Sequence, residues 1–142
     1  QRAIPLVPAS EADCLRRLVD RTDTIGDRDD ASQWLTFLRA LALVEQTTRG
    51  YRRKRVDLTA GELADRLLDG IYGAREVQET LAVAAESLAV DDLDGVVDLP
   101  TWERHHHADP EGVRRQRLRR LIDWFVLCGV VERTRNGRLI HK

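Results

Sequence analysis

The residues in this sequence with the clearest capacity for chemistry are clustered cations. Arg52, Arg53, Lys54 and Arg55 are consecutive, and Arg49 precedes them by three positions. Arginine presents a planar fork of N–H donors that matches phosphate and the edge of guanine, so such a cluster is suited to binding a polyanion. Similar groups recur further along the chain, at Arg115, Gln116, Arg117, Arg119 and Arg120, and again at Arg133, Arg135 and Arg138.

Other kinds of chemistry find little support in the residues. His105, His106 and His107 are adjacent in one short loop, and adjacent histidines do not readily direct their nitrogens at a single ion. Cys14 and Cys128 fall in apolar helical patterns, which favours two reduced core thiols over a disulfide or a reactive nucleophile. The sequence contains no phosphate-binding loop or catalytic signature. We therefore expect no enzyme activity, no bound metal and no cofactor.

The charges of the chain are segregated, although its formal net charge is only −1. Residues 56–100 contain eleven acids and two bases, residues 49–55 contain five bases and no acid, and residues 101–142 contain ten bases and five acids. The sum hides the local potentials that result, so the basic segments are the predicted contact surface. Alternatively, arginines of the last helix pair with acids of residues 56–100 and hold the two halves of the chain together.

The composition is typical of a folded soluble protein. Hydrophobic residues make up 42% of the chain and charged residues 33%, which excludes wholesale disorder. The longest nearly unbroken apolar run, Trp124–Val131, is far too short to cross a bilayer. No charged leader with an apolar core is recognisable, so we expect a cytoplasmic protein with no membrane association.

Hydrophobic spacing predicts helices that lead into two hairpins. In the second helix Trp34, Phe37, Leu38 and Leu41 are expected on the inner face. The predicted helices cover residues 10–21, 30–42, 59–70, 74–88 and 111–128. The predicted hairpins cover residues 43–56, turning at Arg49-Gly50, and residues 130–142, turning at Asn136-Gly137. The fold class is therefore mostly α with small β-hairpins, an α+β protein.

Ala84 and Ala85 are expected to face inward on the fourth helix, and residues 89–109 form an acidic linker.

An internal repeat relates the two helix-and-hairpin segments. At an offset of 87 residues, "LALVEQTTRGYR" and "VLCGVVERTRNGR" share Val44/Val131, Glu45/Glu132, Thr47/Thr134 and Gly50/Gly137. Both stretches resemble the end of a winged helix-turn-helix module, in which a recognition helix enters a two-stranded wing. We expect two winged-helix-like units, residues 1–58 and 59–142, packed as one compact body.

The resemblance covers about fifty residues and lies at the level of the superfamily. It implies a double-stranded DNA-binding protein, expected to be a transcriptional regulator, with each helix in the major groove and each wing against the backbone or minor groove. The alternative is a winged-helix subunit that docks to another protein, and a homodimer through residues 59–88 suits either function. The first unit is too short for three leading helices, so it is either abbreviated or completed by helices of the middle segment.

Side chains on the outer faces of the helices and wings are the predicted DNA contacts. Alternation along the first wing sends Arg53 and Arg55 to one face and Arg52 and Lys54 to the other, so about half of the cluster reaches one ligand. The complete predicted set is Gln33, Thr36, Arg39, Arg49, Arg52, Arg53, Lys54, Arg55, Arg115, Gln116, Arg117, Arg119, Arg120, Arg133, Arg135 and Arg138.

Overall fold

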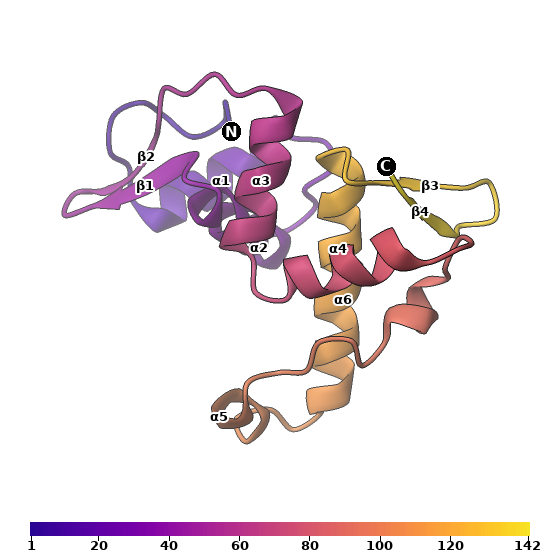
Figure 1. Ribbon diagram of the computed structural model, residues 1–142. Coiled ribbons are helices and arrows are strands. Elements are labelled where there is room, and N and C mark those ends of the chain that lie inside the picture. Colours follow the sequence, from indigo (N-terminus) through magenta and orange to yellow (C-terminus); the bar gives the residue numbers. More distant parts are fainter. The chain divides into compact units, whose positions relative to one another are not determined.

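Each of the two charged hairpins belongs to its own structural unit (Figure 1). The structure is a computed structural model that describes residues 1–142. Unit 1 comprises Gln1–Thr59 and unit 2 comprises Ala60–Lys142. The chain is a mostly helical α+β protein with two small antiparallel hairpins, which confirms the predicted fold class.

Unit 1 consists of two helices followed by a hairpin. Ser10 Oγ begins the first helix by accepting a hydrogen bond from the Asp13 N–H at 3.2 Å, and Asp27 begins the second by accepting from the Asp30 N–H at 2.8 Å. The elements are α1 (Glu11–Arg21), α2 (Arg28–Ala40), β1 (Val44–Thr47) and β2 (Gly50–Arg53). Both helices and the hairpin therefore form where the sequence predicts them.

Leucine and phenylalanine side chains of α2 contribute to the core of unit 1. Leu35, Phe37 and Leu38 are buried. Trp34 is only half-buried and meets Phe37 edge-on, with the ring centroids 5.4 Å apart. The expected place of Trp34 in the core is therefore only partly right, because the most buried row of the helix runs through Ala31, Leu35 and Leu38 at helical spacing.

The turn from α2 into β1 closes tightly on the helix. The Leu43 N–H donates to the Leu38 carbonyl at 2.9 Å, and the Ala42 N–H donates to the Arg39 carbonyl at the same distance. Ala42 has a φ of 57°, in the left-handed region that side chains disfavour. These features define a Schellman-type helix end, which aims the chain directly into the wing.

A segment before α1 pairs with β2 and gives unit 1 a third strand position. Ala9 and Tyr51 exchange two backbone hydrogen bonds, at 2.9 and 2.7 Å, and the Arg53 N–H donates to the Pro5 carbonyl at 2.8 Å. Gly50 has a φ of 127°, and a Cβ at this position would clash with the carbonyl group of Ala9. Only glycine therefore allows the two segments to approach so closely. The sequence pattern does not predict this pairing.

Unit 2 begins with two helices, of which the second is shorter than predicted. Its elements are α3 (Ala60–Gly70), α4 (Ala74–Val83), the 3-10 helix η1 (Val90–Leu93), α5 (Thr101–Arg104), α6 (Pro110–Leu127), β3 (Val131–Arg133) and β4 (Leu139–His141). The predicted inward positions of Ala84 and Ala85 are wrong, because Ala84 is half-buried, Ala85 is exposed, and both lie beyond the helix. The chain extends here, and Leu88 exchanges two backbone hydrogen bonds with Leu139, at 3.0 and 2.7 Å. This bridge repeats the one in unit 1.

α6 carries the core of unit 2 into its hairpin. Leu121, Ile122 and Phe125 are buried, as the helical spacing predicts. The Val130 N–H donates to the Phe125 carbonyl at 2.9 Å across Gly129, whose φ is 75°. The helix end of unit 1 is thus repeated in unit 2, with glycine at the left-handed position. None of the helices combines the length and the apolar character needed to cross a membrane.

The turns of both hairpins differ by one residue from the predicted turns. In unit 2 the Thr134 N–H donates to the Arg138 carbonyl at 2.8 Å, so the loop contains three residues, Arg135–Gly137. A two-residue Asn136-Gly137 turn is therefore wrong, and the chain uses the next most common hairpin loop. In unit 1 the two-residue loop is Thr48–Arg49, one position earlier than predicted.

Candidate nucleic-acid interface

The hairpin of unit 1 holds most of the cationic cluster. Arg52 is exposed on β2 and forms an ion pair across the strands with Glu45. Arg53 is half-buried, and its Nε is enclosed without a hydrogen-bond partner. The predicted alternation of faces fits these two arginines. Because β2 ends at Arg53, Lys54 and Arg55 follow the strand instead of continuing it.

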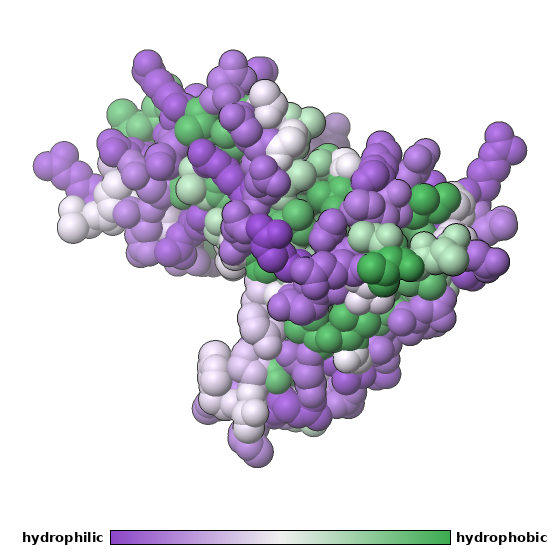
Figure 2. All heavy atoms as spheres, in the orientation of Figure 1, coloured by the Kyte–Doolittle hydropathy of each residue, from purple (hydrophilic) through white to green (hydrophobic).

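Three cations of this segment form no ion pair. Arg49 and Arg55 are exposed, Lys54 is half-buried, and none of these side chains lies within ion-pair distance of a carboxylate. Hydrophilic side chains project from the end of the β1–β2 hairpin on the face that Figure 2 shows. The charges of Arg49, Lys54 and Arg55 are therefore available to an external anion.

The three predicted contacts on α2 are all exposed, as the helical spacing predicts. Gln33 makes no side-chain hydrogen bond, whereas the Thr36 hydroxyl donates to its own helix backbone at 3.0 Å. Arg39 Nη2 donates to Gln46 Oε1 at 3.0 Å, and its guanidinium lies 5.3 Å from the centre of the Tyr51 ring. Arg39 is thus held between the helix and the wing by a hydrogen bond and a cation–π contact.

The outer face of α6 is richer in free cations. Arg115, Gln116 and Arg119 are exposed, Arg120 is half-buried, and none of them pairs with a carboxylate. Arg115 and Arg119 are one helical turn apart, so their side chains lie on the same face. Two guanidinium groups and a neighbouring amide can therefore approach one ligand together.

Arg117 does not present a free charge on this face, so its predicted role as an outward contact needs correction. Its guanidinium forms an ion pair with Glu103 of α5, and His107 Nε2 lies 3.3 Å from the same carboxylate. The hydrogen bond from Arg117 lowers the pKa of Glu103 to about 2, and the contact with His107 acts on this pKa in the same direction. Arg117 therefore joins α6 to α5.

Two of the three predicted contacts in the wing of unit 2 are also engaged. Arg133 Nη2 lies 2.7 Å from Asp123 of α6. Arg138 donates to the hydroxyl of Ser87 at 2.9 Å and to its carbonyl at 2.6 Å, and lies 4.0 Å from Asp92. Arg135, in the loop between the strands, is exposed and forms no ion pair. The wing of unit 2 is therefore tied to its own unit more firmly than the wing of unit 1.

The whole chain, residues 1–142, matches the family described as the halobacterial double winged helix domain. The chain belongs to this family. Its membership confirms the resemblance to the winged-helix superfamily, and the two helix-and-wing units account for the word double in the description. No curated protein and no solved structure matches the chain.

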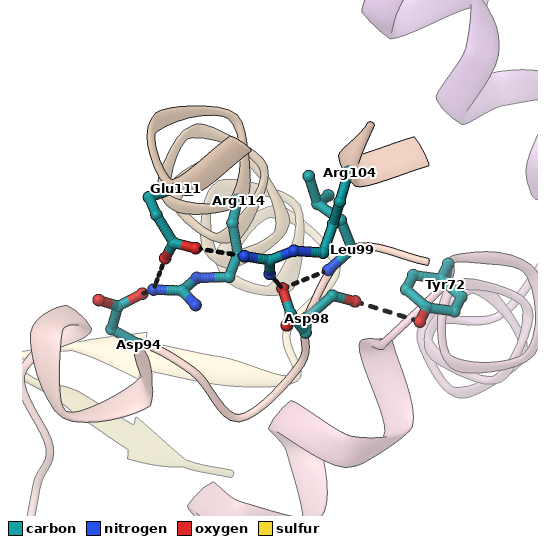
Figure 3. Close-up of polar contacts among 7 residues, drawn as sticks. All are labelled: Tyr72, Asp94, Asp98, Leu99, Arg104, Glu111 and Arg114. Atoms are coloured by element: carbon teal, nitrogen blue, oxygen red, sulfur yellow. Dashed lines mark hydrogen bonds and ion pairs between the residues drawn. The ribbon is translucent and has the colours of Figure 1, made fainter. Parts of the chain in front are cut away.

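In this double winged helix domain, two arginines outside the predicted set fix the acidic segment before α6 (Figure 3). Arg114 Nη2 lies 3.0 Å from Asp94 and 2.8 Å from Glu111. Arg104 pairs with Asp98 and, at 2.8 Å, with Glu111. These ion pairs therefore connect residues of the predicted linker to one another and to α6. The predicted pairing of a last-helix arginine with an acid of residues 56–100 occurs at Arg114, whose partner Asp94 belongs to the same unit.

Arg114 could have been recognised from its position on the helix. It lies four residues before Leu118 and seven before Leu121, on the side of α6 that faces the core. Tyr72 also holds the segment, because its hydroxyl donates to the Asp98 carbonyl at 3.2 Å. The Leu99 N–H and then the Arg104 guanidinium lower the pKa of the Asp98 carboxyl group. No signal in the sequence indicates the contacts that Tyr72 and Arg104 make with Asp98.

The cysteines and histidines of the double winged helix domain do not come together in one cluster. Cys14 and Cys128 are buried free thiols in different units. Burial raises the pKa of both thiols, that of Cys128 to about 11. The structure contains no cluster of three or more histidine, cysteine or carboxylate side chains that could hold a metal ion.

Proposed function

We propose that this chain binds double-stranded DNA and acts as a transcriptional regulator in the cytoplasm, without a catalytic step. The observation that carries the proposal is a set of cations that the fold leaves unpaired on both helix-and-wing units. Helix-turn-helix proteins bring such a helix to the major groove, where cations nearby meet the phosphates. Among the predicted contacts, the unpaired cations are Arg49, Lys54, Arg55, Arg115, Arg119, Arg120 and Arg135.

Their unpaired state matters because the chain is rich in carboxylates, with 24 acids against 23 lysines and arginines. Arg52, Arg117 and Arg133 show that arginines of these surfaces find acidic partners where the fold supplies them. A cation left without a partner keeps its full attraction for phosphate. Each neutralised phosphate contributes about 0.9 to the slope of log affinity against log salt concentration.

Titration of a generic duplex with the full chain over a wide range of potassium chloride concentrations tests the proposal. We expect the affinity to fall steeply as salt rises. In the variant Arg49→Gln/Arg55→Gln the slope should decrease by about 0.9 for each phosphate that is no longer neutralised. The matched control is Arg16→Gln/Arg75→Gln, which removes the same charge from two arginines that are already paired with Asp13 and Asp69. No binding at low salt, or an equal reduction of the slope in both variants, would refute DNA binding through these surfaces.

A docking subunit for another protein is the second candidate, and exposed apolar side chains favour it. Val83, Trp102 and Leu127 expose 83%, 67% and 61% of their surface. Large exposed apolar groups are typical of protein contact sites. Under this alternative, Arg49→Gln/Arg55→Gln leaves complex formation intact, while Trp102→Ala or Leu127→Ala weakens it. Sedimentation with and without the duplex shows whether the partner is a second copy of the chain.

A further inference from the structure

The unpaired cations lie on different elements in the two units. Among the predicted contacts, the unpaired cations of unit 1 are Arg49, Lys54 and Arg55, in and after the hairpin. Arg28, at the start of α2, is a further exposed cation without an ion pair. In unit 2 the largest group lies on α6, and only Arg135 remains free in the hairpin. The unpaired cations of the predicted set therefore lie mainly on the hairpin segment in unit 1 and on α6 in unit 2.

α2 is poorly suited to enter the groove of a duplex. Its first turn contains Asp29 and Asp30 in addition to the capping Asp27, and only Arg28 offsets them. Asp27 and Asp29 are exposed. A recognition helix of a helix-turn-helix protein presents its N-terminal residues to the bases between two phosphate backbones. Three carboxylates at this end would be repelled by those phosphates.

Two of the three predicted contacts on α2 are already engaged. The Thr36 hydroxyl donates to its own helix, and Arg39 is held by Gln46 and by the ring of Tyr51. Only Gln33 among the predicted contacts of α2 is exposed without a side-chain partner. The helix therefore offers one amide to a duplex and no free cation from this set.

α6 has the opposite balance of charge. It contains five arginines against Glu111 and Asp123. At the 87-residue offset of the repeat, Arg28 of α2 matches Arg115 of α6, whereas Asp29 and Ser32 of α2 are replaced by Gln116 and Arg119. Arginine can form paired hydrogen bonds with guanine O6 and N7, and glutamine with adenine N6 and N7. Gln116 and the unpaired Arg119 thus favour approach to DNA in unit 2, whereas Asp29 opposes it at the matching position in unit 1.

We propose that the two units divide the binding of DNA between them, an inference that rests on the proposed function. α6 of unit 2 reads base edges in the major groove, with Arg115, Gln116 and Arg119 as the specificity-determining residues. The hairpin of unit 1 contacts phosphates without regard to sequence, through Arg49 and Arg55. α2 supports its wing through Arg39 and does not read bases.

The test begins with selection of preferred duplexes from a random pool by the full wild-type chain. Affinity for a preferred duplex and for a shuffled one is then measured in wild type and in three variants. We expect Arg115→Ala/Arg119→Ala to reduce the ratio of the two affinities by roughly tenfold or more, because alanine cannot form the paired hydrogen bonds with bases. Arg49→Ala/Arg55→Ala should weaken both duplexes by the same factor. Gln33→Ala/Thr36→Ala should change neither affinity.

A second variant of α6 separates charge from recognition. Arg115→Lys/Arg119→Lys keeps both charges but removes the planar fork, so the preference should fall while the slope against salt stays unchanged. It also serves if the alanine variant does not fold. Loss of preference in the α2 variant alone, or salt-dependent binding without any enriched sequence, would overturn the division between the units. Absence of all binding by the wild type would instead remove the proposed function itself.

Discussion

Exchanging the residues at the two repeated helix ends tests whether unit 1 contains a strained joint. Ala42 ends α2 with a φ of 57°, and Gly129 ends α6 with a φ of 75°. A left-handed backbone costs a residue with a side chain about 1–2 kcal/mol. Glycine avoids this cost but loses about 0.5–1 kcal/mol more conformational free energy on folding. Ala42→Gly should therefore stabilise unit 1 by roughly 0.5–1 kcal/mol.

Gly129→Ala should have the opposite effect, of similar size, in unit 2. A Cβ built on Gly129 meets no atom within 4 Å, so the backbone conformation alone determines the result. The two substitutions should therefore change the free energy of unfolding in opposite directions, although the two helix ends share one geometry. Because the substitutions lie in different units, a double variant should show both effects independently.

Amide hydrogen exchange measures each joint separately. The Leu43 N–H is bound to the Leu38 carbonyl, and the Val130 N–H to the Phe125 carbonyl, each at 2.9 Å. We expect exchange at Leu43 to slow about two- to fivefold in Ala42→Gly, and exchange at Val130 to accelerate by a similar factor in Gly129→Ala. If Ala42→Gly accelerates exchange at Leu43, the left-handed strain assigned to Ala42 is refuted.

Three further substitutions or modifications test other parts of the structure. Gly50→Ala should break the two hydrogen bonds between Ala9 and Tyr51 and destabilise unit 1 by about 1–3 kcal/mol; undiminished protection of the Tyr51 amide would contradict the clash. Glu103→Gln should lower the melting temperature most near neutral pH. Because the folded pKa of Glu103 lies below its usual 4.5, this difference should shrink as pH falls from 4.5 to about 2, and a difference independent of pH would exclude the ion pair as its cause. The thiol of Cys128, with a pKa of about 11, should be alkylated far more slowly in the folded protein than in the unfolded protein. Equal alkylation rates of Cys128 in the two states would argue against its burial.

The helices and hairpins could be predicted from the sequence because their signals are local. Ser10 caps α1 within one residue of the predicted start, and the alternating residues from Val44 give β1 and β2 as predicted, although their pairing is shifted by one residue. The repeat extends the same inference to α6 and its hairpin. Periodicity also identifies Arg115 and Arg119 as outward residues, since it depends only on neighbours along the helix.

The strand bridges could not be predicted because they join distant single residues. Ala9 pairs with Tyr51 and Leu88 pairs with Leu139, and one residue leaves no periodic pattern. The early end of α4 has the same origin. The apolar sequence after Val83 continues a helical pattern, but the hydrogen bonds of Leu88 to β4 draw the chain into an extended conformation.

Whether each arginine is paired with a carboxylate could likewise not be predicted from a helical projection. Such a projection shows that Arg117 is near the surface, but not that Glu103 lies on a separate short helix and neutralises it. The same holds for Arg133, whose partner Asp123 lies on the preceding helix. A count of outward cations therefore overestimates the available charge. The tertiary positions of the acids decide which cations remain.

The features that repeat between the units concern the backbone, and those that differ concern charge. Both units close the last helix on a left-handed residue, enter a hairpin, and add one bridging residue from an earlier segment. These features determine where a helix and a wing lie within a unit, whatever their side chains. At matching helical positions Asp29 changes to Gln116 and Ser32 to Arg119 without altering that backbone arrangement. One frame can thus be kept for geometry while its two copies acquire different binding roles, because surface charge contributes little to holding the fold together.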